Sequence, residues 1–177
     1  MKRIFREIPS WVFYLFILFA FLLLLFSSFR YAFFKLNSAA SQNISDKSYS
    51  HAFSLGISFD AMVASYLLVI PAVAFFFTMF FNYNSLWFRR MITFYFSLAF
   101  FAVLLACCSD IPFYEFCGSR LSIAIVMWAD TPGTMLNYVF ENPAYYPYLL
   151  AFIAGIIVSV LFLLFHQKKM LRNTFEE

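Results

Sequence analysis

Four apolar stretches, each about long enough to cross a lipid bilayer, constrain this chain more than any other feature. A helix rises ~1.5 Å per residue, so about 20 apolar residues cross a hydrocarbon core ~30 Å thick. Hydrophobic residues make up 64% of the 177 residues and charged residues only 12%, which is more apolar surface than a soluble core of this size could bury. We therefore predict an all-α fold, a polytopic membrane helical bundle forming a single domain. The predicted spans are residues 11–29, 53–81, 91–109 and 144–165.

The distribution of basic residues predicts the orientation of these spans. Eight of the twelve Lys and Arg residues lie before the first span, between the second and third spans, or after the fourth. Cytoplasmic segments carry an excess of Lys and Arg, so we expect the N-terminus and residue 177 to be cytoplasmic. We expect the first span to be an uncleaved signal anchor, because it is longer than the apolar core of a signal peptide. The four cations left for the outer segments are Arg30, Lys35, Lys47 and Arg120.

Residues 110–143, between the third and fourth spans, are too long for a plain turn and are predicted to be an outer interfacial segment. Residues 121–129 are apolar enough to lie in the membrane interface as a helix. Thr131 followed by Pro132 suits the start of a second short helix. The segment is acidic, with one cation among its charged residues. These are Asp110, Glu115, Arg120, Asp130 and Glu141.

Asp60 is the carboxylate that is hardest to place in water, because the twenty-one residues after it carry no charge. On a helix, one side holds the residues Gly56, Asp60, Ala61 and Ala64 by i, i+4 spacing, and we expect this side to face the bundle. Serines 54, 58 and 65 lie beside it. Pro71 lies about three turns deeper, removes a backbone donor and crowds the carbonyl of Leu67, which predicts a kink.

The candidate site consists of charged residues at one depth near the outer face: Asp60, Asp110, Glu115 and Arg120. A charge in hydrocarbon costs about 2.5 to 3.5 kcal/mol on insertion scales, and pairing relieves that cost. We expect Arg120, taken as the only nearby cation, to bridge Asp60, Asp110 or both. The guanidinium could also bind a phosphate oxygen with two N–H groups. The site is therefore an ion pair that fixes helix packing, a site for a lipid headgroup or substrate, or both.

The chain contains no motif for a nucleophile, a phosphate loop or a metal centre, so we expect no catalytic residue, no cofactor and no metal in it. The small net charge of +3 predicts no nucleic-acid surface. The three cysteines lack C-x-x-C spacing. Either Cys117 pairs with Cys107 or Cys108 on an oxidising outer face, or all three are small buried side chains.

The second span with its Phe59-Asp60 pair, and the outer segment that begins DIPFYEFCGSR, resemble the N-terminal membrane region of lipoteichoic-acid-synthase-like proteins. These are phosphotransferases of the sulfatase and alkaline-phosphatase superfamily, and the likeness is to Bacteroidetes-type members. The resemblance covers about half of the chain. The positions that carry it are Gly56, Phe59, Asp60, Pro71, Asp110, Tyr114, Arg120 and Asp130.

The resemblance implies five spans followed by an extracellular catalytic domain with a threonine nucleophile and a divalent metal. This sequence holds four predicted spans and no residue onto which that nucleophile or a metal ligand can be carried. We therefore expect a fragment of a longer enzyme in the bacterial inner membrane. Its function would be to anchor the parent phosphotransferase or sulfatase-like hydrolase and to present a lipid-linked substrate to it. Its partners would be membrane lipids and its own C-terminal extracellular catalytic domain.

Two other functions remain open at the level of sequence. One is a complete, non-enzymatic four-span subunit or scaffold. The other is a small transporter in which Asp60 is an ion or proton site and Pro71 breaks the helix beside it. Whether a fifth apolar run follows residue 177 distinguishes the fragment from the scaffold, and flux that requires Asp60 would favour the transporter.

Overall fold

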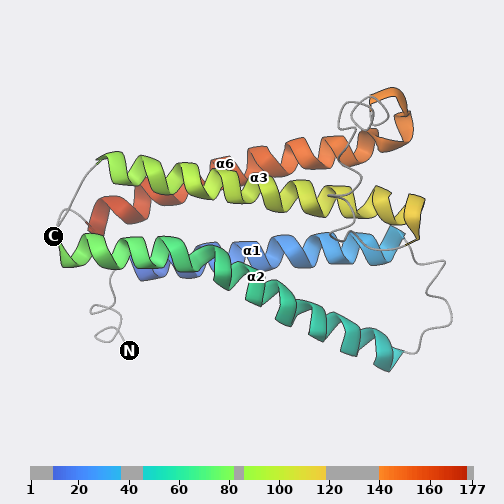
Figure 1. Ribbon diagram of the computed structural model, residues 1–177, viewed down its shortest axis with the longest axis horizontal. Coiled ribbons are helices and arrows are strands. Elements are labelled where there is room, and N and C mark those ends of the chain that lie inside the picture. Colours follow the sequence, from blue (N-terminus) through green and yellow to red (C-terminus); the bar gives the residue numbers. More distant parts are fainter. Residues whose placement is uncertain (1–9, 37–45, 82–85, 119–139, 175–177) are drawn as a thin grey trace. The chain divides into compact units, whose positions relative to one another are not determined.

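The computed structural model describes residues 10–36, 46–81, 86–118 and 140–174, and within these ranges it contains helices and no strand (Figure 1). Each of the four α-helices holds a stretch long and apolar enough to cross a membrane. The prediction of an all-α helical bundle with four candidate spans is confirmed. The elements are α1 (Ser10–Leu36), α2 (Asp46–Phe80), α3 (Leu86–Cys117), η3 (Pro143–Tyr145) and α6 (Tyr146–Thr174).

The helices extend beyond several of the predicted spans. Helix α1 continues seven residues past residue 29 to Leu36, so Arg30 lies within a helix and the prediction of a loop from Arg30 onward is wrong there. Helix α3 continues past residue 109 to Cys117, with Pro112 inside it. A single charge does not end a helix when apolar residues follow, as in the stretch YAFFKL after Arg30.

The predicted interfacial helices of the outer segment lie almost entirely outside the described residues. Phe140 and Glu141, at the end of this segment, are helical. Asn142 then caps η3, because its side-chain oxygen accepts a hydrogen bond of 3.1 Å from the backbone N–H of Ala144.

The chain divides into two compact units. The first contains Met1–Phe96 and Phe162–Glu177, and the second contains Ser97–Leu161. The first unit holds an aromatic cluster around Phe75 of α2, which is 2% exposed. Trp11 stacks on this ring at 5.9 Å, and Tyr14 meets it edge-on at 6.2 Å. The second half of α2 is therefore held to α1 by large side chains.

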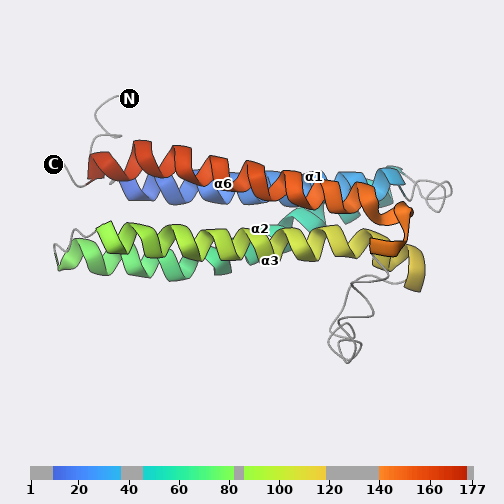
Figure 2. The ribbon, with the colours of Figure 1, turned by 90° about the horizontal axis from the view of Figure 1, so that it is seen from above.

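The end of α6 belongs to the same first unit and runs beside the beginning of α1, as Figure 2 shows. Phe21 and Phe162 stack there with ring centroids 4.0 Å apart. In the second unit, Phe101 of α3 meets Phe152 of α6 edge-on at 5.6 Å. Leu104 of α3 packs against Gly155 of α6, where the absent Cβ allows close approach.

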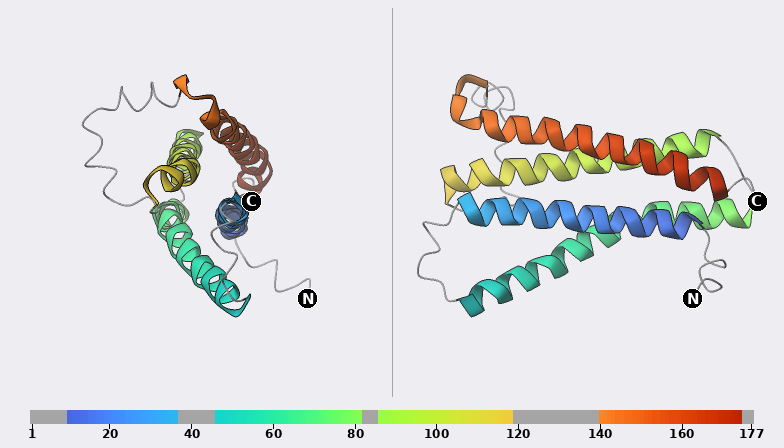
Figure 3. Two further views of the ribbon diagram at one scale, coloured as in Figure 1. Left: turned by 90° about the vertical axis from the view of Figure 1, so that its right-hand side faces the viewer. Right: turned by 180° about the vertical axis from the view of Figure 1, so that it is seen from behind.

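Helix α2 bends along its length (Figures 1 and 3), and it contains Pro71. Proline has no N–H group, so the carbonyl of Leu67, four residues earlier, loses its helical donor. The hydroxyl of Tyr95 in α3 donates to this carbonyl at 2.9 Å instead. The predicted kink is present, and a neighbouring helix satisfies the acceptor that the proline leaves open.

Candidate functional site: an ion pair between α1 and α2

The side of α2 predicted to face the bundle does face it. Gly56 is buried, Asp60 has a side chain 13% exposed, and Ala64 is 0% exposed. The neighbouring serines 54, 58 and 65 are exposed, and the hydroxyls of Ser58 and Ser65 bond to their own helix. Ser58 donates to the carbonyl of Ser54 at 3.3 Å, and Ser65 donates to that of Ala61 at 2.7 Å.

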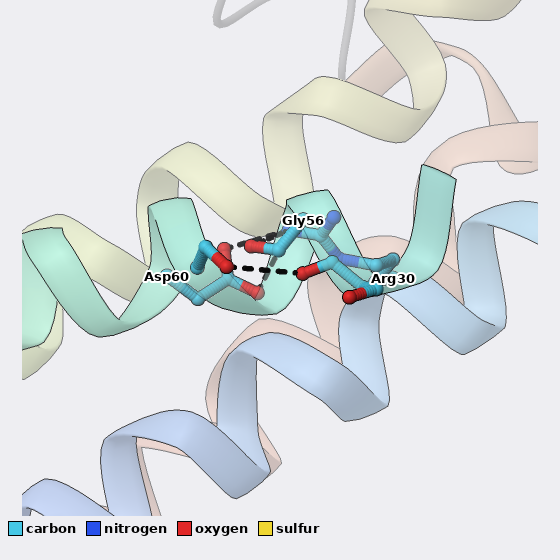
Figure 4. A network of polar contacts seen from close by, with 5 residues as sticks. Arg30, Gly56 and Asp60 are labelled. Atoms are coloured by element: carbon cyan, nitrogen blue, oxygen red, sulfur yellow. Dashed lines mark hydrogen bonds and ion pairs between the residues drawn. The ribbon is translucent and has the colours of Figure 1, made fainter. Parts of the chain in front are cut away.

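The guanidinium of Arg30 reaches from α1 across to this side of α2 (Figure 4). Its Nη2 lies 2.7 Å from both carboxylate oxygens of Asp60 and donates to the carbonyl of Gly56 at 2.9 Å. The Arg30 side chain is only 15% exposed. Hydrogen bonds between ionised groups are stronger than neutral ones, and burial strengthens them further. One nitrogen atom therefore connects α1 to both the backbone and the side chain of α2.

Gly56 makes room for this guanidinium. A Cβ built on Gly56 would overlap Nη1 and Cζ of Arg30. Any larger residue at position 56 would have to displace the arginine head from Asp60, since the same space cannot hold both. The small residue that the sequence pattern placed beside Asp60 is thus part of the ion-pair site.

Both charges lie within the apolar part of their spans. At ~1.5 Å of rise per residue, Arg30 lies about 10 Å and Asp60 about 8 Å from the midpoints of Trp11–Leu36 and Ser50–Phe80. The centre of a hydrocarbon core is ~15 Å from its edge. An unpaired charge costs about 2.5 to 3.5 kcal/mol at the centre of a membrane helix on insertion scales, and less toward its ends. The pairing of Arg30 with Asp60 removes most of that cost for both residues.

Arg30 retains an N–H group that no atom of the described residues accepts. Its Nε is buried and has no hydrogen-bond partner. Both oxygens of Asp60 bind the same nitrogen, Nη2, whereas a carboxylate in a two-point geometry binds two different nitrogens of the guanidinium. Because this Nε is buried, an anionic oxygen can use its N–H group only after the surrounding side chains move apart.

The structure corrects the prediction that Arg120 is the only cation near Asp60, because Arg30 lies beside it. Arg120 lies outside the described residues, as does the side chain of Glu115. Whether Arg120 also bridges Asp60 or Asp110 stays a prediction. Asp110 is half-buried in α3 and belongs to the second unit, whereas Asp60 belongs to the first.

Sequence reasoning missed Arg30 because the charge itself was used to mark the end of the first span. A usable signal was present in the residues that follow it. Five of the six residues from Tyr31 to Leu36 are apolar or aromatic, and only Lys35 is charged. A helix that continues through them places Arg30 inside the apolar region, where a buried cation requires an acidic partner.

The cysteine and metal predictions are tested only in part. Cys108 is buried at 7% exposure and Cys107 is half-buried. The side chain of Cys117 lies outside the description, so its pairing stays a prediction. Among the described residues, no group of three or more His, Cys, Asp or Glu side chains could hold a metal ion.

These features define a multi-pass α-helical membrane protein with an arginine–aspartate pair inside its apolar region. No protein-family model, curated protein or solved structure matches the chain. The resemblance to lipoteichoic-acid-synthase-like proteins stays a prediction.

Proposed function

We propose that this chain anchors an outward-facing phosphoglycerol-transferase or sulfatase-like enzyme in the bacterial inner membrane and presents a lipid-linked substrate to it. The observation that carries the proposal is the Arg30–Asp60 pair with its unused Nε–H group. Most buried donors in folded proteins have a partner, and Nε of Arg30 is one of four buried polar side-chain atoms among the described residues that lack one. A donor left open on a buried cation suits an anionic oxygen, such as a headgroup phosphate.

The proposal places the N-terminus and residue 177 on the cytoplasmic side. The beginning of α1, the end of α2 and the beginning of α3 lie at one end of the first unit (Figure 1). Arg89 and Arg90 lie at this end, and Arg30 lies nearer to the other end of α1. Because Arg30 is paired within a helix, it no longer counts as an outer-loop cation. The remaining charge bias therefore favours this orientation more strongly.

Headgroup binding by the purified chain tests the proposal directly. In nanodiscs that contain equal amounts of phosphatidylglycerol and phosphatidylcholine, native mass spectrometry of the released protein should find phosphatidylglycerol retained in preference. Arg30→Gln should abolish the preference. Arg90→Gln is a matched control, because Arg90 is exposed near the opposite end of the unit and its loss should leave the preference in place. Equal retention by wild type and Arg30→Gln would contradict a headgroup site at Arg30.

The anchoring role is tested in the native membrane. Cells labelled with radioactive glycerol should transfer less phosphoglycerol into envelope polymer when the chain is removed, and expression of the native gene should restore the transfer. Unchanged transfer would reject the enzyme-anchor function even if the purified chain bound the lipid.

The transporter alternative receives less support from the site geometry. Both oxygens of Asp60 accept hydrogen bonds from Arg30, and the guanidinium already balances its charge. A carboxylate that carries protons or ions must release such a partner in every cycle. Flux through proteoliposomes that disappeared with Asp60→Asn would nevertheless favour the transporter over the anchor.

A further inference from the structure

The two halves of α2 make different contacts with the rest of the first unit. We call residues 50–66 the α2 arm and residues 67–80 the α2 stem. The stem lies alongside α1, whereas the arm diverges from it (Figures 1 and 3). The stem contains Pro71 and begins at Leu67, the residue whose carbonyl loses its helical donor to the proline.

Besides Asp60, the inward positions of the arm are the small residues Gly56 and Ala64. Most of its large side chains point outward, with Phe59 64% and Tyr66 70% exposed. Dispersion contacts between helices scale with the side chains that meet, so this half is weakly packed against α1. Its hydrogen bonds to Arg30 are therefore the strongest specific connection to α1 among the described residues.

The bend lacks one of the hydrogen bonds that stiffen a helix. Pro71 cannot donate to the carbonyl of Leu67, and the Tyr95 hydroxyl that replaces it comes from α3 and not from α2. A helix with a missing internal bond bends at lower cost at that point. The arm therefore has a defined point about which it can rotate.

We infer that the α2 arm is a hinged segment that rotates about the bend near Pro71. The Arg30–Asp60 pair holds this arm in its closed position. Opening separates Asp60 from Arg30 and exposes the guanidinium to the surrounding lipid. An anionic phosphate that binds Arg30 competes with Asp60 and favours the open position. This last step rests on the proposed function, whereas the hinge and the ion-pair latch do not.

Distance distributions measured by double electron–electron resonance in nanodiscs test the hinge. Spin labels carried by unnatural amino acids at Tyr31 of α1 and Ser54 of the arm report opening and leave the native cysteines in place. Both positions are exposed. A matched pair at Val12 and Phe76, which are 36% and 59% exposed, reports on α1 and the stem. The double variant Arg30→Met/Asp60→Leu removes the latch and leaves no unpaired charge, so it is expected to fold.

In phosphatidylcholine nanodiscs, the labels at positions 31 and 54 (the arm pair) should give one narrow distance distribution in the wild type. In the double variant, this distribution should broaden toward longer distances. The labels at positions 12 and 76 (the stem pair) should give the same distance distribution in both proteins. An unchanged arm distance in the double variant would overturn the latch. Broadening of both label pairs would also overturn it, because the loss would then be a general loosening.

The lipid step is read from the wild-type protein in nanodiscs that contain phosphatidylglycerol. Broadening of the arm distance there, absent from Arg30→Gln with the same lipid, supports opening driven by the headgroup. If the arm opens in the double variant but phosphatidylglycerol does not change the wild-type distance, the hinge is supported and the headgroup is rejected as its trigger. Failure of the hinge and failure of the proposed function are thus distinguishable.

Discussion

The arm and the stem of α2 belong to one helix, yet different forces hold them to α1. The stem inserts Phe75 between Trp11 and Tyr14, and large aromatic rings supply its contacts. The arm presents Gly56 and Ala64 and depends on a single charged residue of α1. Lipid tails are as apolar as leucine, so a helix in a bilayer gains little from apolar burial alone. The comparison shows two solutions to that problem, which are close packing of rings and a paired charge.

Removal of one charge should have the largest effect. Arg30→Leu leaves Asp60 unpaired in the apolar region, and the loss of one partner of a buried pair costs about 3 to 5 kcal/mol. Unfolding titrations in mixed detergent micelles should show this loss. Arg30→Leu/Asp60→Leu should recover most of it, because neither charge then remains. Equal stability of wild type and Arg30→Leu would mean that the pair does not hold the arm.

Truncation of the central ring of the stem should have the next largest effect. Phe75→Ala removes the ring contacts with Trp11, Tyr14 and Phe88, and at about 0.5 to 1.5 kcal/mol for each ring pair we expect a loss of about 2 to 3 kcal/mol in the same titration. Phe76→Ala is the matched control, since Phe76 is 59% exposed and should change the stability little. A similar loss for both variants would show that the cluster around Phe75 has no special role.

Adding a side chain at Gly56, which lies beneath the guanidinium, should reduce stability somewhat less than Phe75→Ala does. Gly56→Ala places a methyl group where the Arg30 head lies, and we expect about 1 to 3 kcal/mol of destabilisation from overpacking. Gly155→Ala is a useful comparison, because its Cβ would meet only the side-chain end of Leu104, which no ion pair restrains. The ranking would be contradicted if Gly155→Ala were the more damaging of the two substitutions.

Loss of the hydroxyl at the bend should have the smallest effect. Tyr95→Phe removes the donor to the carbonyl of Leu67, and hydrogen bonds between membrane helices contribute about 0.6 kcal/mol on average. Tyr66→Phe should leave stability unchanged, since Tyr66 is 70% exposed. If the two variants behaved alike, the Tyr95 bond would make no measurable contribution to the bend.

Sequence reasoning located the elements of the fold because hydropathy and length are properties of local segments. The four spans, the inward side of α2 and the bend at Pro71 all follow from spacing within one helix. The partner of Asp60 could not be read in the same way. Pairing between α1 and α2 depends on how far α1 continues and on how the two helices cross, and the charge of Arg30 was mistaken for the end of α1.

The hydroxyl that satisfies Leu67 comes from a residue twenty-eight positions later in the chain. When spans insert in chain order, α2 enters the bilayer before α3, which carries its replacement donor, lies beside it. Until α3 follows, the Leu67 carbonyl must bind water or a component of the insertion machinery, because lipid tails offer no donor. The final bend of α2 is thus completed by the helix that is inserted after it.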